Sequence, residues 1–282
     1  MKSFPTDQIK LAVFDIDDTL LPRGRFALSS PTKKAIHQLH ENGIITIPAT
    51  GRGSYNTPAQ IIDVLKPPFL ITINGHIILK QNEIIGSAPI DRQVISELYA
   101  FCFSHHLSLI YKTRDSYQHV LDANIDKSAK LERTAKEIYG CFLIPPPNFP
   151  ISLLAKQFPS LVFTKGGDGY DVYGCDADKS FGIELVLKQL NHNWENVLCF
   201  GDAENDLTMI QKAGLGVAMG NACGSLKVAA DVICGNAEDD GIADFLNQSY
   251  FLPREIEGRT LERNLRSFYC SAFFVSHKQK EG

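Results

Sequence analysis

The sequence predicts an α/β fold: an open parallel-sheet core with helices on both faces, and an α+β domain inserted into that core. Three observations support this prediction. Short apolar strands alternate with helices over the first 80 residues, the alternation then stops, and it resumes near residue 177. Since strands that alternate with helices are typical of parallel sheets, the interruption indicates a discontinuous core.

The opening segment contains the pattern strand, helix, strand, helix, strand. A short apolar run at 11–14 fits a strand buried on both faces. Ser30-Pro31 predicts the beginning of a helix and Gly43 its end, because Ser caps helices, Pro suits the first helical position and Gly follows the last one. Further expected elements are strands at 44–49 and 69–72, a helix at 55–65 and a hairpin turn at Asn74-Gly75.

The central segment mixes helices and strands without that alternation, which favours an α+β insert. We expect helices at 91–104, 126–139 and 152–158, and strands at 107–111, 117–121, 161–163 and 170–173. We place the insert at 81–176, so that 1–80 and 177–252 form the core. The tail 253–282 is of uncertain origin and is left out of the fold prediction.

Regular alternation resumes after the insert. Asp178 is expected to cap a helix that carries Ile183, Leu187 and Leu190 on one face. The expected elements that follow are a strand at 197–200, a helix from about Glu204, and closing strands at 216–219 and 232–234. They would complete the parallel sheet that the opening segment begins.

Composition narrows the class of partner. With 28 basic and 32 acidic residues the net charge is −4, so no basic field favours nucleic acid or an anionic membrane. No apolar run has the length of a membrane span, and we see no signal peptide. The seven scattered cysteines suggest reduced thiols in a cytoplasmic protein. The oligomeric state is not predicted.

Two carboxylates follow the first strand directly. Asp15 would lie at its carboxyl end and Asp17 on the loop beyond, where open α/β sheets carry their chemistry. Two nearby carboxylates can take different roles if their surroundings separate their pKa values. The stretch is equally compatible with a strand that ends in an Asx turn.

Three further segments could hold ions or phosphate. Asp202, Asn205 and Asp206 follow the strand at 197–200, and their oxygens suit Mg²⁺, although acidic residues are also favoured at any helix start. Thr50-Gly51-Arg52 offers a hydroxyl and a backbone N–H to a phosphate, or forms a simple turn. Lys179 alone carries almost no information.

Taken in order, these motifs resemble those of the haloacid-dehalogenase-like superfamily, and within it the Cof-type phosphatases of subclass IIB, which carry an α/β cap. The resemblance spans residues 9–247 and rests on four ordered motifs at 15–21, 49–52, 179 and 201–207, with further matches at 73–75, 216–222 and 240–242. The chain departs from the common pattern at Asp18, Pro48 and Ser180. None of these changes removes a reactive group.

The resemblance implies a Rossmann-like core, a cap that acts as a lid over the substrate, and a Mg²⁺-dependent phosphatase. Its substrate would be a small phosphorylated metabolite, either a sugar phosphate or a nucleotide-like or cofactor-like phosphate. Asp15 would be the nucleophile that forms an aspartyl-phosphate, and Asp17 the general acid and base, with Thr50 and Lys179 as the other catalytic residues. The implied phosphate-binding residues are Thr50, Gly51, Arg52, Asn74, Lys179 and Asn205, and the implied metal ligands are Asp15, Asp17 (through its carbonyl), Asp202 and Asp206.

Two alternatives stay open. A sugar phosphomutase of the phosphomannomutase type shares the motifs and the cap type, but would retain phosphate on the sugar. A regulatory phosphate-binding protein would bind without turnover, and it is disfavoured because every reactive group is present.

Overall fold

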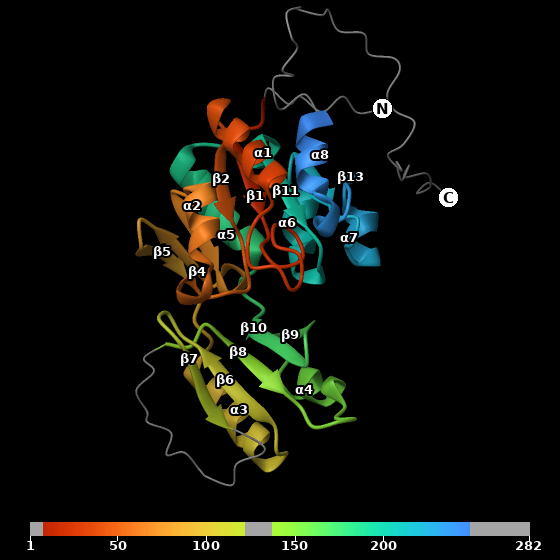
Figure 1. The fold of residues 1–282 in the computed structure, drawn as a ribbon. Coiled ribbons are helices and arrows are strands. Elements are labelled where there is room, and N and C mark those ends of the chain that lie inside the picture. Colours follow the sequence, from red (N-terminus) through yellow and green to blue (C-terminus); the bar gives the residue numbers. More distant parts are fainter. Residues whose placement is uncertain (1–7, 122–136, 249–282) are drawn as a thin grey trace, which may run out of the picture. The chain divides into compact units, whose positions relative to one another are not determined.

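The computed structural model describes residues 8–121 and 137–248. It divides into two compact units, and Figure 1 labels their helices and strands. The described residues of the first unit are 8–48, 59–67 and 191–248, and those of the second are 49–58, 68–121 and 137–190. The predicted tail 253–282 and most of the predicted helix 126–139 lie outside the described residues.

The first unit contains a parallel sheet of five strands in the order β13-β12-β11-β1-β2. Its strands are β1 (Leu11–Phe14), β2 (Ile45–Pro48), β11 (Val197–Gly201), β12 (Leu215–Ala218) and β13 (Val232–Ile233). All residues of β1, β11 and β12 are buried, as their continuous apolar runs require. The predicted parallel core is therefore confirmed.

Helices of the same unit lie on both faces of the sheet. They are α1 (Ser30–Glu41), α2 (Ala59–Leu65), α6 (Leu207–Lys212), α7 (Gly224–Ala229) and α8 (Gly241–Gln248). Because β2 lies beside β1 while β12 lies on the far side of β11, right-handed crossovers place α1 and α6 on opposite faces. Helix α1 packs against α2 and α8, and α6 against α7.

The ends of α1 show how closely local signals set a boundary. Its N-cap is Ser29, whose hydroxyl accepts the Thr32 N–H, so the prediction of Ser30 was wrong by one residue. Both serines fit the cap by type, and Pro31 is compatible with the second helical position as well. At the other end Gly43 adopts φ 73°, which confirms the predicted stop.

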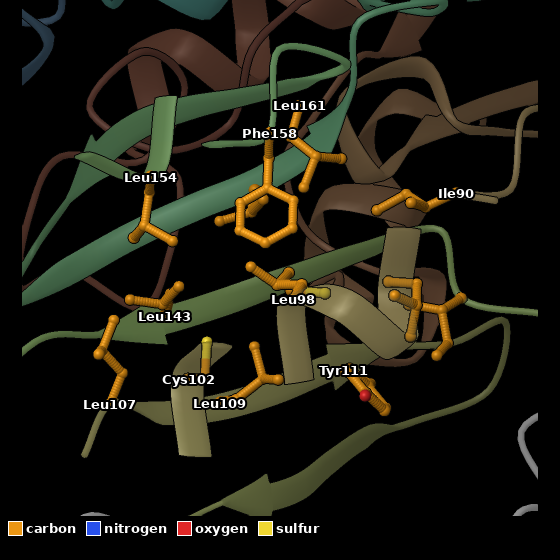
Figure 2. Close-up of a cluster of buried hydrophobic side chains, with 14 residues drawn as sticks. Ile90, Leu98, Cys102, Leu107, Leu109, Tyr111, Leu143, Leu154, Phe158 and Leu161 are labelled. Carbon is orange, nitrogen blue, oxygen red and sulfur yellow. The ribbon is translucent and has the colours of Figure 1, made fainter. Parts of the chain in front are cut away.

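The second unit contains an antiparallel sheet of five strands in the order β7-β6-β8-β10-β9. The strands are β6 (Ser108–Lys112), β7 (Tyr117–Leu121), β8 (Gly140–Ile144), β9 (Leu161–Gly166) and β10 (Gly169–Gly174). Helices α3 (Arg92–Ser104) and α4 (Ile151–Gln157) supply Leu98, Cys102 and Leu154 to its buried core (Figure 2). Strand β8 was missed: Gly140, predicted to stop a helix, begins it.

A second, smaller sheet of the same unit joins β3 (Phe69–Thr72), β4 (Ile77–Lys80) and β5 (Glu83–Ser87) in antiparallel order. Helix α5 (Lys179–Leu190) packs against β3 and β4. The hairpin turn predicted at Asn74-Gly75 is confirmed, with φ values of 52° and 89°. The expectation that 69–72 joins the parallel sheet as a third strand was wrong. Apart from one parallel bridge, Ala49 to Ile71, β3 pairs with β4 in antiparallel orientation.

The predicted helix at 55–65 is also shorter than expected. A 3₁₀ turn at Ser54–Asn56 comes first, and α2 begins only at Ala59. Thr57-Pro58 separates the two, because the residue before a proline is disfavoured in the helical conformation.

Candidate active site

Three carboxylates converge in the first unit. Asp15 follows β1 and Asp202 follows β11, and these strands are direct neighbours: Phe14 pairs with Phe200, and the Asp15 N–H donates to the Phe200 carbonyl at 3.0 Å. The strand order reverses between β1 and β11, which is where ligands bind in open α/β sheets. One oxygen each of Asp15, Asp202 and Asp206 lies within 4.8 Å of the others.

Backbone groups hold Asp206 in this cluster. Its side chain is fully buried, and its Oδ2 accepts the N–H groups of Asp202 (3.0 Å) and Ala203 (3.1 Å). Gly201 makes this fold-back possible, since a Cβ there would lie 2.6 Å from the Cβ of Asp206. The turn from β11 into α6 is therefore shaped around the carboxylate.

A side chain from the first motif orients Asp202. The Thr19 hydroxyl donates to Asp202 Oδ1 at 2.8 Å, and Thr19 is itself buried. Sequence reasoning did not assign a site role to Thr19, although the residue stands within the matched motif. Its position four residues after Asp15 was the only signal available.

The loop that carries Asp17 is fastened from another part of the same unit. Asp18 adopts a left-handed conformation with φ 57°, and its carbonyl accepts the Asn221 amide at 2.7 Å. Asn221 Oδ1 in turn accepts the N–H of Ala237 at 2.9 Å. Asp tolerates this conformation better than most residues, so the turn accepts Asp18.

The donor set of this cluster fits Mg²⁺. Hard divalent cations prefer carboxylate oxygens, and three of them lie close together at one sheet edge. Asp17 is exposed, and within the described residues its carboxylate is not part of the group. Its predicted contribution through the main-chain carbonyl, and the predicted phosphate contact of Asn205, stay predictions.

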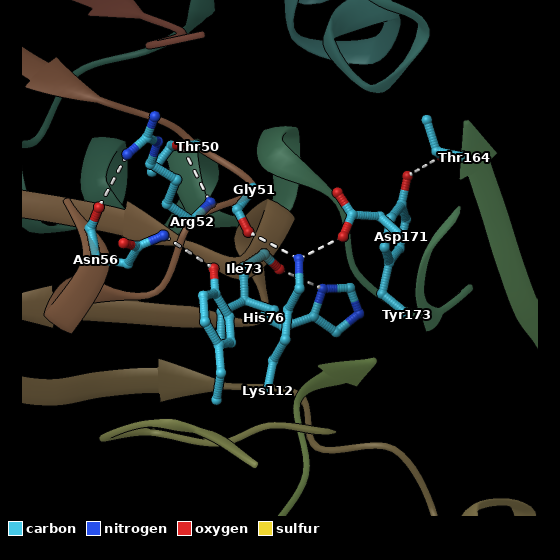
Figure 3. A network of polar contacts seen from close by, with 11 residues as sticks. Thr50, Gly51, Arg52, Asn56, Ile73, His76, Lys112, Thr164, Asp171 and Tyr173 are labelled. Atoms are coloured by element: carbon cyan, nitrogen blue, oxygen red, sulfur yellow. Dashed lines mark hydrogen bonds and ion pairs between the residues drawn. The ribbon is translucent and has the colours of Figure 1, made fainter. Parts of the chain in front are cut away.

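A second group of predicted residues converges in the second unit, around the loop Thr50-Gly51-Arg52 (Figure 3). The carbonyls of Thr50 and Arg52 accept the N–H groups of Asn74 and Ile73, both at 2.9 Å. The Arg52 N–H donates to Thr50 Oγ1 at 3.1 Å. Since this contact uses only a lone pair of the hydroxyl, the Thr50 O–H keeps its own proton for an anionic acceptor.

Asn74 and Lys179 complete this group. A Cβ on Gly51 would lie 3.3 Å from Asn74 Oδ1, so the loop and the buried Asn74 side chain are in close contact. A Cβ on Gly75 would lie 1.9 Å from the Asp178 carbonyl, so only glycine lets the 73–75 turn approach the start of α5. Lys179, fully buried, is the first residue of α5.

The start of α5 is capped as predicted. Asp178 Oδ1 accepts the Phe181 N–H at 3.0 Å and the Ser180 hydroxyl at 2.7 Å. Ser180, one of the positions at which the chain departs from the common pattern, thus has a local role. The Arg52 side chain extends toward Asn56, and its Nη1 donates to the Asn56 carbonyl at 3.1 Å (Figure 3).

A buried imidazole lies behind the 73–75 turn. His76 Nδ1 is 3.0 Å from the Ile73 carbonyl and Nε2 is 3.1 Å from the Gly174 carbonyl. Burial lowers the pKa of His76, although both carbonyls favour its protonated form. Burial also raises the pKa of Tyr173, whose ring lies 5.5 Å from that of His76.

Sequence reasoning missed Lys112 as well. Its ammonium group contacts the Gly51 carbonyl and the Asp171 carboxylate, and the residue is only 5% exposed. Its sequence context, the end of an ordinary strand, gives no signal of this contact, because the loop that it reaches is 61 positions away.

The sequence is similar to those of known hydrolases. Residues 12–145 and 146–246 match the family model described as haloacid dehalogenase-like hydrolase. A 5-amino-6-(5-phospho-D-ribitylamino)uracil phosphatase from Bacillus subtilis is 28% identical over 240 residues, which are 83% of this chain and 93% of that protein. A putative bifunctional phosphatase/peptidyl-prolyl cis-trans isomerase from Streptococcus pyogenes is 26% identical over 269 residues. The matched region is 90% of this chain but only 57% of that longer protein.

A solved structure shows the same fold. The chain is similar to a subclass IIB sugar phosphatase with a TM-score of 0.75 and 22% identity, over 86% of this chain and all of the other.

Within residues 8–121 and 137–248 there is no helix with the length and apolarity needed to span a membrane.

Proposed function

Because the chain belongs to the haloacid dehalogenase-like hydrolase family, we propose that it is a Mg²⁺-dependent phosphatase that hydrolyses a small phosphorylated metabolite through an aspartyl-phosphate. The observation that supports this most directly is the cluster of Asp15, Asp202 and Asp206 at the ends of neighbouring strands. Mg²⁺ held there, with the Asp17 carbonyl as a further ligand, would offset the repulsion between the Asp15 carboxylate and an anionic phosphate.

In the proposed reaction a carboxylate oxygen of Asp15 attacks phosphorus, and the bond from phosphorus to the ester oxygen breaks. Asp17, in its protonated form, gives its proton to the leaving oxygen. Asp17 then removes a proton from water, whose oxygen attacks phosphorus and displaces Asp15. The exposed position of Asp17 is compatible with exchange of this proton.

Thr50 and Lys179 would stabilise the equatorial oxygens, where charge is spread in the transition state. The Thr50 hydroxyl is oriented for this by the Arg52 N–H. Gly51, Arg52, Asn74 and Asn205 are proposed to bind the same phosphate group through their N–H groups or side chains.

Substitution of the two reacting carboxylates tests the mechanism. We expect Asp15→Asn and Asp17→Asn each to abolish turnover of p-nitrophenyl phosphate in Mg²⁺, because the first removes the nucleophile and the second the proton donor. Phosphate release is measured for both variants, with Asp244→Asn, an exposed acidic residue of the same unit, as the control. Robust activity of Asp15→Asn would exclude the covalent route.

The substrate class is the finer part of the proposal. We propose a sugar phosphate or a nucleotide-like or cofactor-like phosphate, handled in the cytoplasm, with residues 81–176 as the segment that selects the leaving group. The six cysteines of the described chain are free thiols, which fits a reducing compartment. A screen of phosphorylated metabolites identifies the class: release of free phosphate supports hydrolysis, whereas isomer interconversion without release supports a phosphomutase.

A further inference from the structure

We infer that Lys112, paired with Asp171, is a positioning residue that fixes the loop Thr50-Gly51-Arg52 for phosphate binding. The inference rests on the proposed function, because it concerns how the same phosphate group is held. All of these residues belong to the second unit. Lys112 ends β6, and Asp171 lies in β10.

Lys112 forms a partly buried ion pair in which the ammonium group is the more buried partner. Its Nζ donates to the Gly51 carbonyl at 3.2 Å and to Asp171 Oδ1 (Figure 3). The side chains of Lys112 and Asp171 are 7% and 27% exposed. A buried ammonium group is costly unless a counter-charge and further acceptors compensate it, so both partners are needed to keep Lys112 where it is.

A glycine makes room for this contact. Strand β8 lies between β6 and β10, and Lys112 pairs directly with Gly140. A Cβ on Gly140 would lie 3.5 Å from Lys112 Cδ and 3.0 Å from Ile73 Cγ2. The lysine stem therefore crosses β8 at a position without a side chain and reaches Asp171 on the far strand.

The three carbonyls of the loop are each held by a different donor. Those of Thr50 and Arg52 accept backbone N–H groups of Asn74 and Ile73. The carbonyl of Gly51 accepts the Lys112 side chain instead. Lys112 thus donates a hydrogen bond to the Gly51 carbonyl, as the backbone of the 73–75 turn does to the carbonyls of Thr50 and Arg52.

This contact acts on the Thr50 hydroxyl through one peptide plane. The Gly51 carbonyl and the Arg52 N–H belong to the same rigid peptide unit. When Lys112 fixes the carbonyl, it also fixes the N–H that donates to Thr50 Oγ1. Removal of the Lys112 ammonium group should let this peptide rotate and release the orientation of the hydroxyl.

Tyr117 contacts the segment that directly follows this loop. Tyr117 is the residue paired with Lys112 across β6 and β7, and its ring lies 5.9 Å from Lys112 Nζ. Its hydroxyl is 3.4 Å from the Asn56 amide, and its ring meets Tyr55 edge-on with centroids 5.0 Å apart. The turn end of the β6–β7 hairpin therefore contacts the 51–56 segment through both of these paired residues.

The test measures kcat and KM with p-nitrophenyl phosphate, together with the inhibition constant of inorganic phosphate. We expect Lys112→Met to raise KM and the phosphate inhibition constant together and to lower kcat/KM by roughly 10-fold to 100-fold, since small misplacements of a positioning group cost this much. Lys112→Arg, which keeps a cationic donor, should recover part of the loss. Lys156→Met removes an exposed lysine of the same unit and should change nothing.

A purely structural role would give a different result. Partial unfolding of Lys112→Met lowers the active fraction and hence apparent kcat, but leaves KM and the phosphate inhibition constant unchanged, and that outcome would overturn the inference. Asp171→Asn should raise the phosphate inhibition constant less than Lys112→Met does. Because Asp171 acts through the lysine, the double variant should have the same inhibition constant as Lys112→Met. Additive effects would contradict this.

Failure of the proposed function can be told apart from failure of the inference. If the wild type releases phosphate from esters and Lys112→Met does so with unchanged constants, the function stands and the inference falls. If the wild type turns over no ester, calorimetric titration with inorganic phosphate decides: weaker binding by Lys112→Met supports the positioning role, and equal or absent binding in both proteins refutes it.

Discussion

At the scale of single residues, Asp206 shows how one carboxylate serves structure and chemistry together. One of its oxygens accepts two backbone N–H groups, and the residue also belongs to the acidic cluster. An amide side chain offers the same kind of acceptor oxygen, but its NH₂ group cannot bind a cation. The two roles can therefore be separated by experiment.

We expect Asp206→Asn to keep the fold and to weaken Mg²⁺ binding by roughly 10-fold to 100-fold. Asp206→Ala should in addition lower the free energy of unfolding by about 1–3 kcal/mol, because a buried N–H pair loses its acceptor. Calorimetric titration with Mg²⁺ and urea unfolding measure the two effects independently of turnover. Equal Mg²⁺ affinity of wild type and Asp206→Asn would remove Asp206 from the metal site.

At the same scale, the sequence identifies reactive groups better than supporting ones. Asp15 and Asp202 could be predicted as neighbours because each directly follows a strand of one parallel sheet, and Asp206 lies in the turn that Asp202 begins. Lys112 could not, since its contact with Gly51 depends on two strand pairings and on the absence of a side chain at Gly140. Such a role becomes visible only when distant segments are placed.

At the scale of elements, turn chemistry was the most reliable signal. Gly43 and Asn74-Gly75 stand where a left-handed conformation is required, and both turns were predicted. Strand β8 was missed because a glycine at a strand start resembles a glycine at a helix end. The sheet to which 69–72 belongs was misassigned because strand periodicity contains no information on pairing partners.

The turn beside β4 should give the protein a pH-dependent stability. Burial holds the pKa of His76 below its usual 6.5. As the pH falls below about 6.5, His76 is protonated in the unfolded chain before it is protonated in the folded one. The free energy of unfolding should therefore decrease, by at most about 1.4 kcal/mol per pH unit for one proton. Above that pH both states are neutral at His76 and the effect disappears.

Urea unfolding between pH 5.5 and 8 measures this dependence in wild type and His76→Gln. Burial also lowers the pKa of His40 in the first unit, so His40→Gln serves as the comparison. Asp176 favours the protonated form of His76 and so limits the size of the effect. If the free energy of unfolding changes with pH in His76→Gln as it does in the wild type, His76 does not contribute to the pH dependence of stability.

At the scale of the whole molecule, the predicted catalytic residues divide between two units that are each discontinuous in sequence. The acidic cluster belongs to the first unit, and Thr50, Asn74 and Lys179 belong to the second. The class of fold and the motif order could be predicted because both depend on short segments of the sequence. The assignment of 49–58 to the second unit could not, because it depends on contacts with the 73–75 turn and with Lys112.

Together with the proposed Mg²⁺ site, this division predicts that Mg²⁺ stabilises one unit selectively. A ligand that binds only the folded state adds about 2.7 kcal/mol at 100 times its dissociation constant. For a unit with about 110 described residues we expect the unfolding temperature to rise by roughly 10 °C. Because all three clustered carboxylates lie in the first unit, calorimetry that resolves two transitions should show Mg²⁺ shifting one of them. EDTA should reverse the shift, and Asp244→Asn should preserve it. An undiminished shift in the triple variant Asp15→Asn, Asp202→Asn, Asp206→Asn would mean that Mg²⁺ stabilises the protein from another site.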